Sequence, residues 1–466
     1  MITLATMPPR TLVIGLDCAP PALVFDRYLS QLPNIESLMQ QGCYGPLRSS
    51  EPPITVPAWT CMVTGRDPGE LGLYGFRSRI RGSYDLKVAT SENVKHKRVW
   101  DWLGEAGHKV AALFVPLTWP PPPVRGKLVS GFLAPHDGSA YTFPASYAQV
   151  LEERFGPHIS DVSDFRHGDA ERIVSDLRVM AEQHFSIAEY VWETEKPSFM
   201  MMVELGTDRL HHALWHRMDP LHPAYEKDHP LELAAIDYYR LLDARIGRLM
   251  KLAGPSTNVL VVSDHGARSM QGGFAINEWL RREGWLHLHT EPTSPGPLKN
   301  EMIDWTRTRA WSTGGYYARV FLNVAGRDPQ GIIPSGQYDA TLQELRSDLE
   351  RLSCPTGEPL PHRFVDPRRG YRSVQGFAPD LMLYLDGLNL RALGTVGGES
   401  LFPKEDDRGV DGCNHDWNGI FVMRGPDLPH RGKLEGMQIY DVGKTILGTM
   451  GVEPPDGLLG KDWSAK

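Results

Sequence analysis

Three short apolar runs, each ending at an acidic residue, constrain the fold of this 466-residue chain more than any other feature. The runs are Thr11–Leu16 before Asp17, Phe199–Val203 before Glu204, and Asn258–Ser263 before Asp264. Runs of this length that are apolar on both faces are typical of buried parallel strands. We therefore expect a parallel sheet with acidic side chains at the carboxyl ends of its strands.

A helix is predicted between the second and third of these strands, over residues 231–252. Apolar side chains recur there on one side at helical spacing, namely Ile236, Tyr239, Leu242, Ile246 and Leu249. Alternation of strand and helix predicts an α/β fold. In such folds the ligand crevice lies at the carboxyl ends of the strands, so we expect Asp17, Asp208 and Asp264 to converge.

The chain divides by composition into a core and an insertion. Residues 267–410 are rich in Gly and Pro and contain two further strand candidates, Tyr317–Asn323 and Leu381–Leu385. We predict that residues 1–266 and 411–466 form the core, and that residues 267–410 form a smaller cap or insertion with its own sheet. These boundaries are approximate.

The bulk charge and hydropathy exclude some partners. A formal net charge of −8 offers no attraction for a nucleic-acid backbone, which needs clustered Lys and Arg. A small phosphorylated substrate remains possible, because bound cations can outweigh the overall charge locally. No apolar stretch approaches the ~20 residues that span a bilayer, and the N-terminus lacks a signal-peptide pattern. We expect a soluble protein without a membrane partner; the sequence indicates no oligomeric state.

The five cysteines are an odd number without a CxxC pair, which favours reduced thiols in the cytoplasm over a disulfide framework. Cys18 and Cys413 flank candidate metal ligands and are alternative ligands themselves. We favour the carboxylate and imidazole groups beside them, because those groups already complete an oxygen and nitrogen set.

Candidate metal ligands occur in three places. Asp208 and His212 are four residues apart and share one face if the segment is helical, although a solvated ion pair on a surface helix would look the same. Asp264 and His265 directly follow a predicted strand, and the next residue, Gly266, would let the chain turn sharply so that both side chains reach the crevice. The alternative is that this segment caps a helix and binds no metal. His415 alone would not indicate a site. Together they predict two cation sites of the kind that zinc or manganese prefers.

The candidate nucleophile is Thr55, in the segment Pro52-Pro-Ile-Thr-Val-Pro57, at the expected start of a helix. A helix N-terminus offers backbone N–H groups to an anion. Thr60 and Thr64 follow shortly after this segment, and we interpret their hydroxyls as capping or packing groups.

Five ordered blocks of this sequence resemble the alkaline phosphatase superfamily, and within it the branch of type I phosphodiesterases, nucleotide pyrophosphatases and predicted phosphohydrolases or phosphomutases. The blocks are Leu16-Asp17, the Thr-x-Pro to Val-Thr-Gly segment at 55–65, Asp208-x-x-x-His212, Ser263-Asp264-His265-Gly266, and His415 ahead of Gly419-Ile-Phe and Gly425-Pro426. The resemblance implies an alkaline phosphatase-like core with a mostly parallel central sheet flanked by helices, plus the smaller cap.

The same resemblance implies the chemistry. One divalent metal ion would be held by Asp17, Thr55, Asp264 and His265, and a second by Asp208, His212 and His415, with zinc the expected metal and manganese an alternative. Thr55 would attack a phosphate ester, and water would hydrolyse the resulting phosphothreonine. The chain would thus be a metal-dependent phosphodiesterase or nucleotide pyrophosphatase. A phosphomutase is the alternative within this chemistry, and a non-catalytic metal-binding protein is the alternative outside it.

Two departures from the pattern narrow this expectation. Sulfatases carry an Arg four residues after their nucleophile, whereas this chain has Trp59, which argues against sulfate esters. Nucleotide pyrophosphatases carry an Asn shortly after the Thr-Gly block, and this chain reads Leu71-Gly-Leu-Tyr-Gly-Phe76 instead. Arg77, Arg79 or the run Lys95–Arg98 are possible replacements, although the run is more typical of solvated surface charge.

Overall fold

The computed structural model describes residues 9–135, 137–166, 168–222, 224–403 and 411–465. Within these, a ten-stranded sheet forms the centre of the molecule, in the order β21-β2-β20-β9-β1-β8-β5-β6-β7, with β22 paired to β2. Its middle strands are parallel: β9 (Asn258–Val262), β1 (Thr11–Leu16), β8 (Phe199–Glu204), β5 (Val110–Leu113) and β6 (Gly126–Val129). The three strands predicted from the sequence therefore lie side by side at the centre of the sheet.

The edges of the central sheet are antiparallel. On one side β20 (Asn418–Arg424) pairs antiparallel with β9, and β2 (Cys43–Arg48) pairs antiparallel with β20. Short strands complete the two edges: β21 (Gly432–Lys433), β22 (Met437–Gln438) and β7 (Thr142–Phe143). The fold class is the predicted one, α/β with a mostly parallel sheet.

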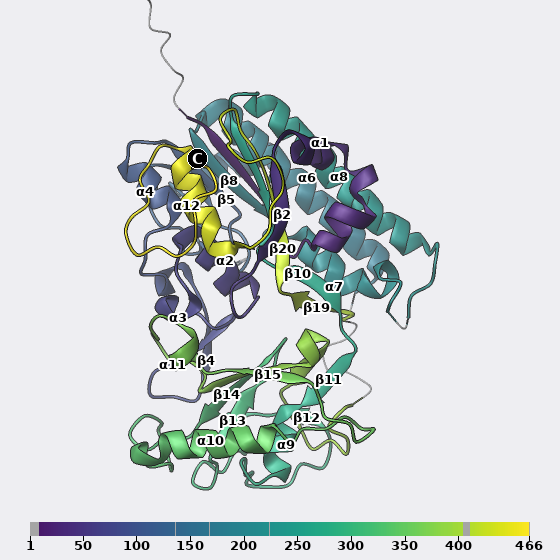
Figure 1. The fold of residues 1–466 in the computed structure, drawn as a ribbon, viewed down its shortest axis with the longest axis vertical. Helices are drawn as coiled ribbons and strands as arrows, with labels where there is room; N and C mark the ends of the chain where they lie inside the picture. The colour runs from purple at the N-terminus through teal and green to yellow at the C-terminus, as the bar shows by residue number, and fades with distance from the viewer. Residues whose placement is uncertain (1–8, 136, 167, 223, 404–410, 466) are drawn as a thin grey trace, which may run out of the picture.

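Helices cover both faces of the central sheet (Figure 1). Leu12, Ile14 and Leu16 of β1 point into one apolar cluster and Val13 points into the other, as the two-residue period of a strand requires. The first face is covered by α1 (Pro33–Gln41), α6 (Ala170–Glu195), α7 (Gly206–Met218) and α8 (Pro230–Ala253). The second is covered by α2 (Thr55–Thr64), α4 (Val99–Glu105) and α12 (Ile439–Thr449). The predicted helix 231–252 is confirmed as α8.

A second sheet lies below the first in Figure 1 and has its own apolar core. Among the described residues its order is β11-β17-β16-β14-β13, with β15 paired to β16. The strands are β11 (Gly272–Ala275), β13 (Ala310–Thr313), β14 (Ala318–Leu322), β15 (His362–Val365), β16 (Leu381–Leu385) and β17 (Leu390–Leu393). Helices α9 (Ile276–Arg282) and α10 (Tyr338–Leu349) pack on this sheet, and both strand candidates from the sequence belong to it.

The hairpin of β3 (Arg77–Arg79) and β4 (Leu86–Val88) joins the two parts. It comes from the segment we assigned to the core, yet Tyr84 in its turn belongs to the apolar cluster of the second sheet and stacks on Trp305 at 3.5 Å. Arg79 forms a buried ion pair with Asp328 at 2.6 Å. Because an unpaired buried charge is costly, this pair fixes the second sheet to the hairpin.

No helix in the described part of the chain combines the length and the apolar character needed to cross a bilayer.

Candidate metal centre

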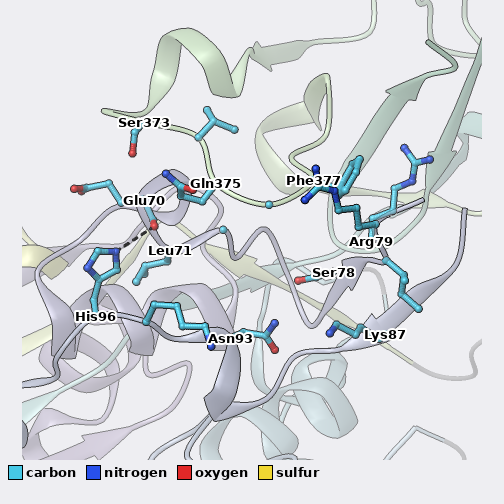
Figure 2. Close-up of a pocket in the computed structure, with 16 residues that line it drawn as sticks. Glu70, Leu71, Ser78, Arg79, Lys87, Asn93, His96, Ser373, Gln375 and Phe377 are labelled. Atoms are coloured by element: carbon cyan, nitrogen blue, oxygen red, sulfur yellow. Dashed lines mark hydrogen bonds between the residues drawn. The ribbon is translucent and has the colours of Figure 1, made fainter. Parts of the chain in front are cut away.

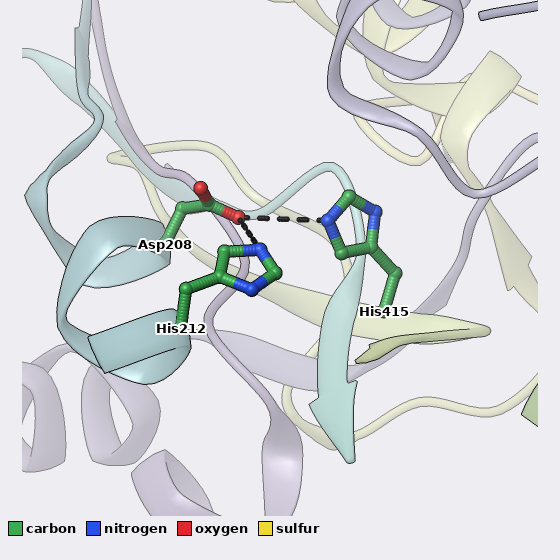
Figure 3. A group of neighbouring side chains, drawn as sticks. All are labelled: Asp208, His212 and His415. Carbon is green, nitrogen blue, oxygen red and sulfur yellow. Dashed lines mark ion pairs between the residues drawn. The ribbon is translucent and has the colours of Figure 1, made fainter. Parts of the chain in front are cut away.

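The first group of candidate ligands lies where β8 ends and α7 begins. Asp208 and His212 are one turn apart on α7, and His415 reaches them from β19 (Cys413–Asp416) (Figure 3). Oδ1 of Asp208 lies 3.3 Å from Nε2 of His212 and 3.7 Å from Nε2 of His415. All three side chains are buried. The helical spacing read from the sequence thus produces the shared face that was expected.

The second group lies at the carboxyl ends of β1 and β9. Nε2 of His265 is 3.2 Å from Oδ2 of Asp264 and 3.6 Å from Oδ1 of Asp17. The hydroxyl of Thr55, the first residue of α2, is 3.3 Å from the same nitrogen. These side chains are buried as well. Parallel strands therefore bring together residues far apart in the sequence, as their position at the strand ends predicts.

The two groups adjoin each other. The rings of His265 and His415 stack with their centroids 3.9 Å apart. Donor atoms of Asp17, Asp208 and His265 also lie within 4.8 Å of one another, as do those of Asp208, His212 and His415. Asp208 is thus close to both groups, whereas the family pattern assigns it to one. We refer to these seven residues as the metal cradle: Asp17, Thr55, Asp208, His212, Asp264, His265 and His415.

The donor atoms of the cradle are of the kind that bind divalent cations. Oδ1 of Asp17, Oδ1 of Asp208 and Oδ2 of Asp264 are buried and have no hydrogen-bond partner among the described residues. Buried carboxylate oxygens are almost always partnered, because desolvation without compensation is costly. Three orphaned oxygens beside three imidazoles are explained by cations that take both oxygen and nitrogen ligands, as zinc and manganese do.

Hydrogen bonds at Nδ1 orient the three imidazole rings of the cradle. Nδ1 of His212 lies 2.7 Å from Oδ1 of Asp411. Nδ1 of His265 lies 3.1 Å from the Gly266 carbonyl oxygen, and Nδ1 of His415 lies 2.8 Å from the Pro53 carbonyl oxygen. An acceptor at Nδ1 holds the proton of that nitrogen, so Nε2 is the nitrogen whose lone pair is available to a cation when the ring is neutral. All three Nε2 atoms face the cradle, which is how such outer contacts orient metal-binding histidines.

Asp411 contacts the candidate ligand His212, and sequence reasoning missed it. It stands at the boundary we drew between cap and core, and Arg166 donates to its second oxygen at 2.9 Å. No sequence signal connects Asp411 to His212, because the two residues are 199 positions apart.

Burial and charge shift the pKa values of the cradle. Burial, together with the charge of Asp208, raises the pKa of Asp17 well above its usual range. Burial and the charge of Asp17 do the same to Asp264. Burial lowers the pKa of His265 to about 4, and burial with the neighbouring His265 lowers that of His415. Neutral imidazoles and crowded carboxylates both favour cations, which need free lone pairs and relieve repulsion between like charges.

The pKa values of Asp208 and His212 are shifted in directions opposite to those of the other carboxylates and imidazoles of the cradle. Burial alone would raise the pKa of Asp208, but His212 and Arg209 lower it well below its usual range. Burial alone would lower the pKa of His212, but contact with Tyr316, Asp411 and Asp208 raises it. Asp208 therefore carries the most firmly ionised carboxylate of the cradle.

Local structure explains why Thr55 stands apart from the other threonines of α2. Ile54 is in an extended conformation and Thr55 begins the helix, so its hydroxyl projects towards His265. The hydroxyls of Thr60 and Thr64 donate to the carbonyls of Val56 and Thr60, each at 2.7 Å. Those two hydroxyls bond to backbone carbonyls within the helix, in agreement with our interpretation of them as packing groups.

Gly266 has a different role from the one predicted. Its backbone is not in the left-handed region, so its φ does not require glycine. A Cβ atom at this position would lie 2.3 Å from the carbonyl oxygen of Asn418. Glycine is needed because the backbone approaches the first residue of β20 closely here, at the start of β10 (Gly266–Ser269), which pairs with the His415-bearing strand β19.

The alternative ligands and donors have other partners. The thiols of Cys18 and Cys413 donate to backbone carbonyls of Gly266 and Asn414. Among the proposed replacements for the missing Asn, Arg79 is committed to Asp328. In the basic run, Lys97 pairs with Glu105, and Arg98 donates to the Ser91 carbonyl.

A cavity of about 1040 Å³ opens between the core and the second sheet (Figure 2). Its lining includes Arg81, Lys87 and Lys95 on one side, with Gln375 and Phe377 from the loop that precedes β16 on the other. None of the cradle residues lines it, so we assign the chemistry to the cradle and not to this cavity.

Trp59 holds one of the cradle carboxylates. Its indole Nε1 donates to Oδ2 of Asp17 at 2.7 Å, and its ring packs so closely on β1 that a Cβ at Gly15 would lie 2.4 Å from it. The residue that departs from the sulfatase pattern therefore orients Asp17, leaving the other carboxylate oxygen free to face the cradle.

Changing Trp59→Phe is expected to weaken metal binding by roughly 10- to 100-fold, because Asp17 loses the donor that orients it. Isothermal titration of the metal-free protein with Zn²⁺ measures this. Trp100→Phe is the matched control, since Trp100 is equally buried and its Nε1 has no partner among the described residues. Equal affinity in the Trp59 variant and the wild type would show that the indole only fills space.

The fold and the cradle together define a member of the alkaline phosphatase superfamily, in which a mainly parallel sheet carries metal ligands at its strand ends. More narrowly, the chain belongs to the type I phosphodiesterase/nucleotide pyrophosphatase family, whose model matches residues 11–411. It is accordingly a phosphoester hydrolase by family. A search of curated protein sequences gives no significant match.

Solved structures share the fold across nearly the whole chain at low sequence identity. Human ectonucleotide pyrophosphatase/phosphodiesterase 5 is 14% identical, with a TM-score of 0.57 and 98% of both chains covered. The murine protein, in an inactive form in complex with AMP, has a TM-score of 0.55. Phosphonoacetate hydrolase from Sinorhizobium meliloti, in complex with phosphonoformate, is 14% identical with a TM-score of 0.60, covering 95% of this chain and 96% of its own.

Proposed function

We propose that this protein is a two-metal phosphodiesterase of the nucleotide pyrophosphatase type that acts through a phosphothreonine at Thr55. One observation carries the proposal: three unpartnered carboxylate oxygens and three Nε2 atoms lie in two adjoining groups, and the Thr55 hydroxyl contacts Nε2 of His265 in one of them. A threonine hydroxyl is a weak nucleophile at neutral pH and needs activation.

The position of each cradle residue determines which of the two cations it would hold. Asp17, Asp264 and His265 would hold the cation next to Thr55, and His212 and His415 would hold the other, with Asp208 facing both. Two divalent cations, when bound, would supply the charge that activates a hydroxyl and offsets negative charge developing on phosphoryl oxygens. Zinc is the metal we propose, with manganese as the alternative, because the donors are carboxylates and imidazoles.

The chain's own residues account for attack and release. The Thr55 oxygen would bond to phosphorus as the bond from phosphorus to the leaving oxygen breaks, which forms the phosphothreonine. Water would then add to the same phosphorus and release Thr55 with its proton restored. The N-terminus of α2 would offer backbone N–H groups to the phosphoryl group and favour its negative charge.

The proposal includes the cellular compartment of the protein. All five cysteines are free, and four of them are buried. Buried unpaired thiols fit a reducing environment, so we place the protein in the cytoplasm.

A substrate panel tests this function. Zinc-loaded protein is expected to turn over bis-p-nitrophenyl phosphate faster than p-nitrophenyl phosphate, and both faster than p-nitrophenyl sulfate, measured as kcat/KM. Phosphonoacetate belongs in the panel because a protein of the same fold hydrolyses it, as its name states. A preference for the monoester or for phosphonoacetate would refute the diesterase assignment, and no turnover of any ester by fully loaded protein would refute the hydrolase.

A further inference from the structure

The hydroxyl of Tyr316 reaches the metal cradle from the second sheet. Tyr316 lies in the turn between β13 and β14, and its ring packs on His415 with centroids 4.2 Å apart. Its hydroxyl oxygen is 3.1 Å from Nε2 of His212, the nitrogen that faces the cradle. The side chain is buried. A phenol from the cap therefore stands at the position where ligands of a cation at His212 would gather.

The turn that carries Tyr316 is fixed on several sides. Gly315 exchanges two backbone hydrogen bonds with Ala392 of β17, at 2.8 and 3.0 Å. The Tyr316 carbonyl accepts from the side chain of Asn414, the neighbour of His415. On the other side, the Tyr317 hydroxyl donates to the carbonyl of Tyr74. A group held this firmly is pre-organised, so little entropy is lost when it contacts a ligand.

A closed ring of contacts sets the direction of the Tyr316 proton. Arg166 donates one N–H to the Tyr316 oxygen and another to Asp411, and Asp411 accepts from Nδ1 of His212. Guanidinium has no acceptor, so it occupies a lone pair of the phenol oxygen and leaves the phenol O–H to donate elsewhere. In the described structure the one remaining partner of that hydroxyl is Nε2 of His212.

A cation at His212 would remove that partner. If the Nε2 lone pair of His212 were bound to a cation, it would not accept a hydrogen bond from Tyr316. A buried O–H without an acceptor is costly. The acceptor that the proposed reaction brings to this place is a phosphoryl oxygen.

We infer that Tyr316 is a catalytic residue that donates a hydrogen bond to a phosphoryl oxygen of the substrate, in place of the Asn that this sequence lacks. Arg166 acts through Tyr316 and is a positioning residue. The inference rests on the proposed phosphoester chemistry of the cradle. It assigns to the second sheet a direct part in that chemistry, since the donor comes from the β13–β14 turn.

The test compares Tyr316→Phe with Tyr317→Phe. Both changes remove one buried phenol hydroxyl from the same turn, but the Tyr317 hydroxyl contacts the Tyr74 carbonyl and not the cradle. For each zinc-loaded variant we would measure metal content, the Kd for inorganic phosphate by calorimetry, and kcat and KM for bis-p-nitrophenyl phosphate. A small and similar drop in Tm is expected in both.

In Tyr316→Phe, the Kd for phosphate is expected to rise roughly 10-fold, as for loss of a hydrogen bond to a charged group. The kcat is expected to fall about 100-fold, as for loss of one oxyanion donor, with two cations retained. Tyr317→Phe is expected to match the wild type in phosphate affinity and kcat.

Unchanged phosphate affinity in Tyr316→Phe would overturn the inference, and so would loss of a cation, which would make the phenol a metal ligand. Failure of the proposed function looks different, because loaded wild-type protein would then turn over no phosphoester. The phosphate affinities of the two variants would still decide whether Tyr316 is a donor.

Discussion

Thr55→Ala is expected to abolish turnover, with kcat falling on the order of 10⁴-fold or more, because the attacking oxygen is removed. Fold and metal content should stay nearly intact, since the other six residues of the cradle remain. Steady-state kinetics, together with metal analysis of the same sample, measures both effects.

Thr60→Ala is the matched control for this change. Thr60 lies in the same helix, is similarly buried and donates its hydroxyl to the Val56 carbonyl at 2.7 Å. Its removal should cost about 1 kcal/mol of stability and leave kcat almost unchanged. Peptide mapping of a quenched reaction gives a direct answer: phosphate on any residue other than Thr55 refutes the assignment, and absence of a phosphoenzyme under every quench condition would favour direct attack by water.

Asp208→Asn is expected to weaken both metal sites, by more than about 100-fold each, whereas His415→Ala should empty mainly one. Asp208 lies close to both groups of ligands, and its change removes a negative charge without changing the size of the side chain. It also removes one of the two carboxylates that Arg209 contacts, since Arg209 lies 2.8 Å from Oδ2 of Asp208 and 2.7 Å from Oδ2 of Asp161, and so it makes the charge beside the cradle more positive. Cations are destabilised by both effects.

Metal-to-protein ratios after dialysis against a weak chelator measure this contrast. The wild type is expected to retain two cations, the His415 variant about one, held by Asp17, Asp264 and His265, and the Asp208 variant fewer than one. Loss of a single cation in Asp208→Asn would show that Asp208 serves one site alone. Equal loss of both cations in the His415 variant would show that the two sites assemble cooperatively.

Local patterns in the sequence were enough to predict the framework of the site. The runs before Asp17 and Asp264 are strands, because continuous burial on both faces leaves a readable apolar pattern. The helix over 230–253 was readable from its 3.6-residue period. The same period placed Asp208 and His212 on one face. In each case the signal lies within a few consecutive residues.

The contacts that complete the candidate site were not readable in this way. Asp411, Arg166 and Tyr316 join into one network with His212, although Arg166 and Asp411 are 245 positions apart. Trp59 looked like a departure from a pattern, and only its contact with Asp17 shows what it does. Arg79 looked available for the substrate, yet it is committed to Asp328.

The sequence by itself determined the strands, the principal helix and the candidate ligands, because periodicity and the position of polar groups at strand ends are properties of short segments. The tertiary structure alone decided which distant side chains meet at the cradle: the approach of Asp208 to both groups of ligands, the carbonyls and carboxylate that orient the histidines, and the placement of Tyr316 from the second sheet. Such contacts depend on how sheets and turns pack against one another, and packing between segments hundreds of residues apart leaves no periodic trace in a single sequence.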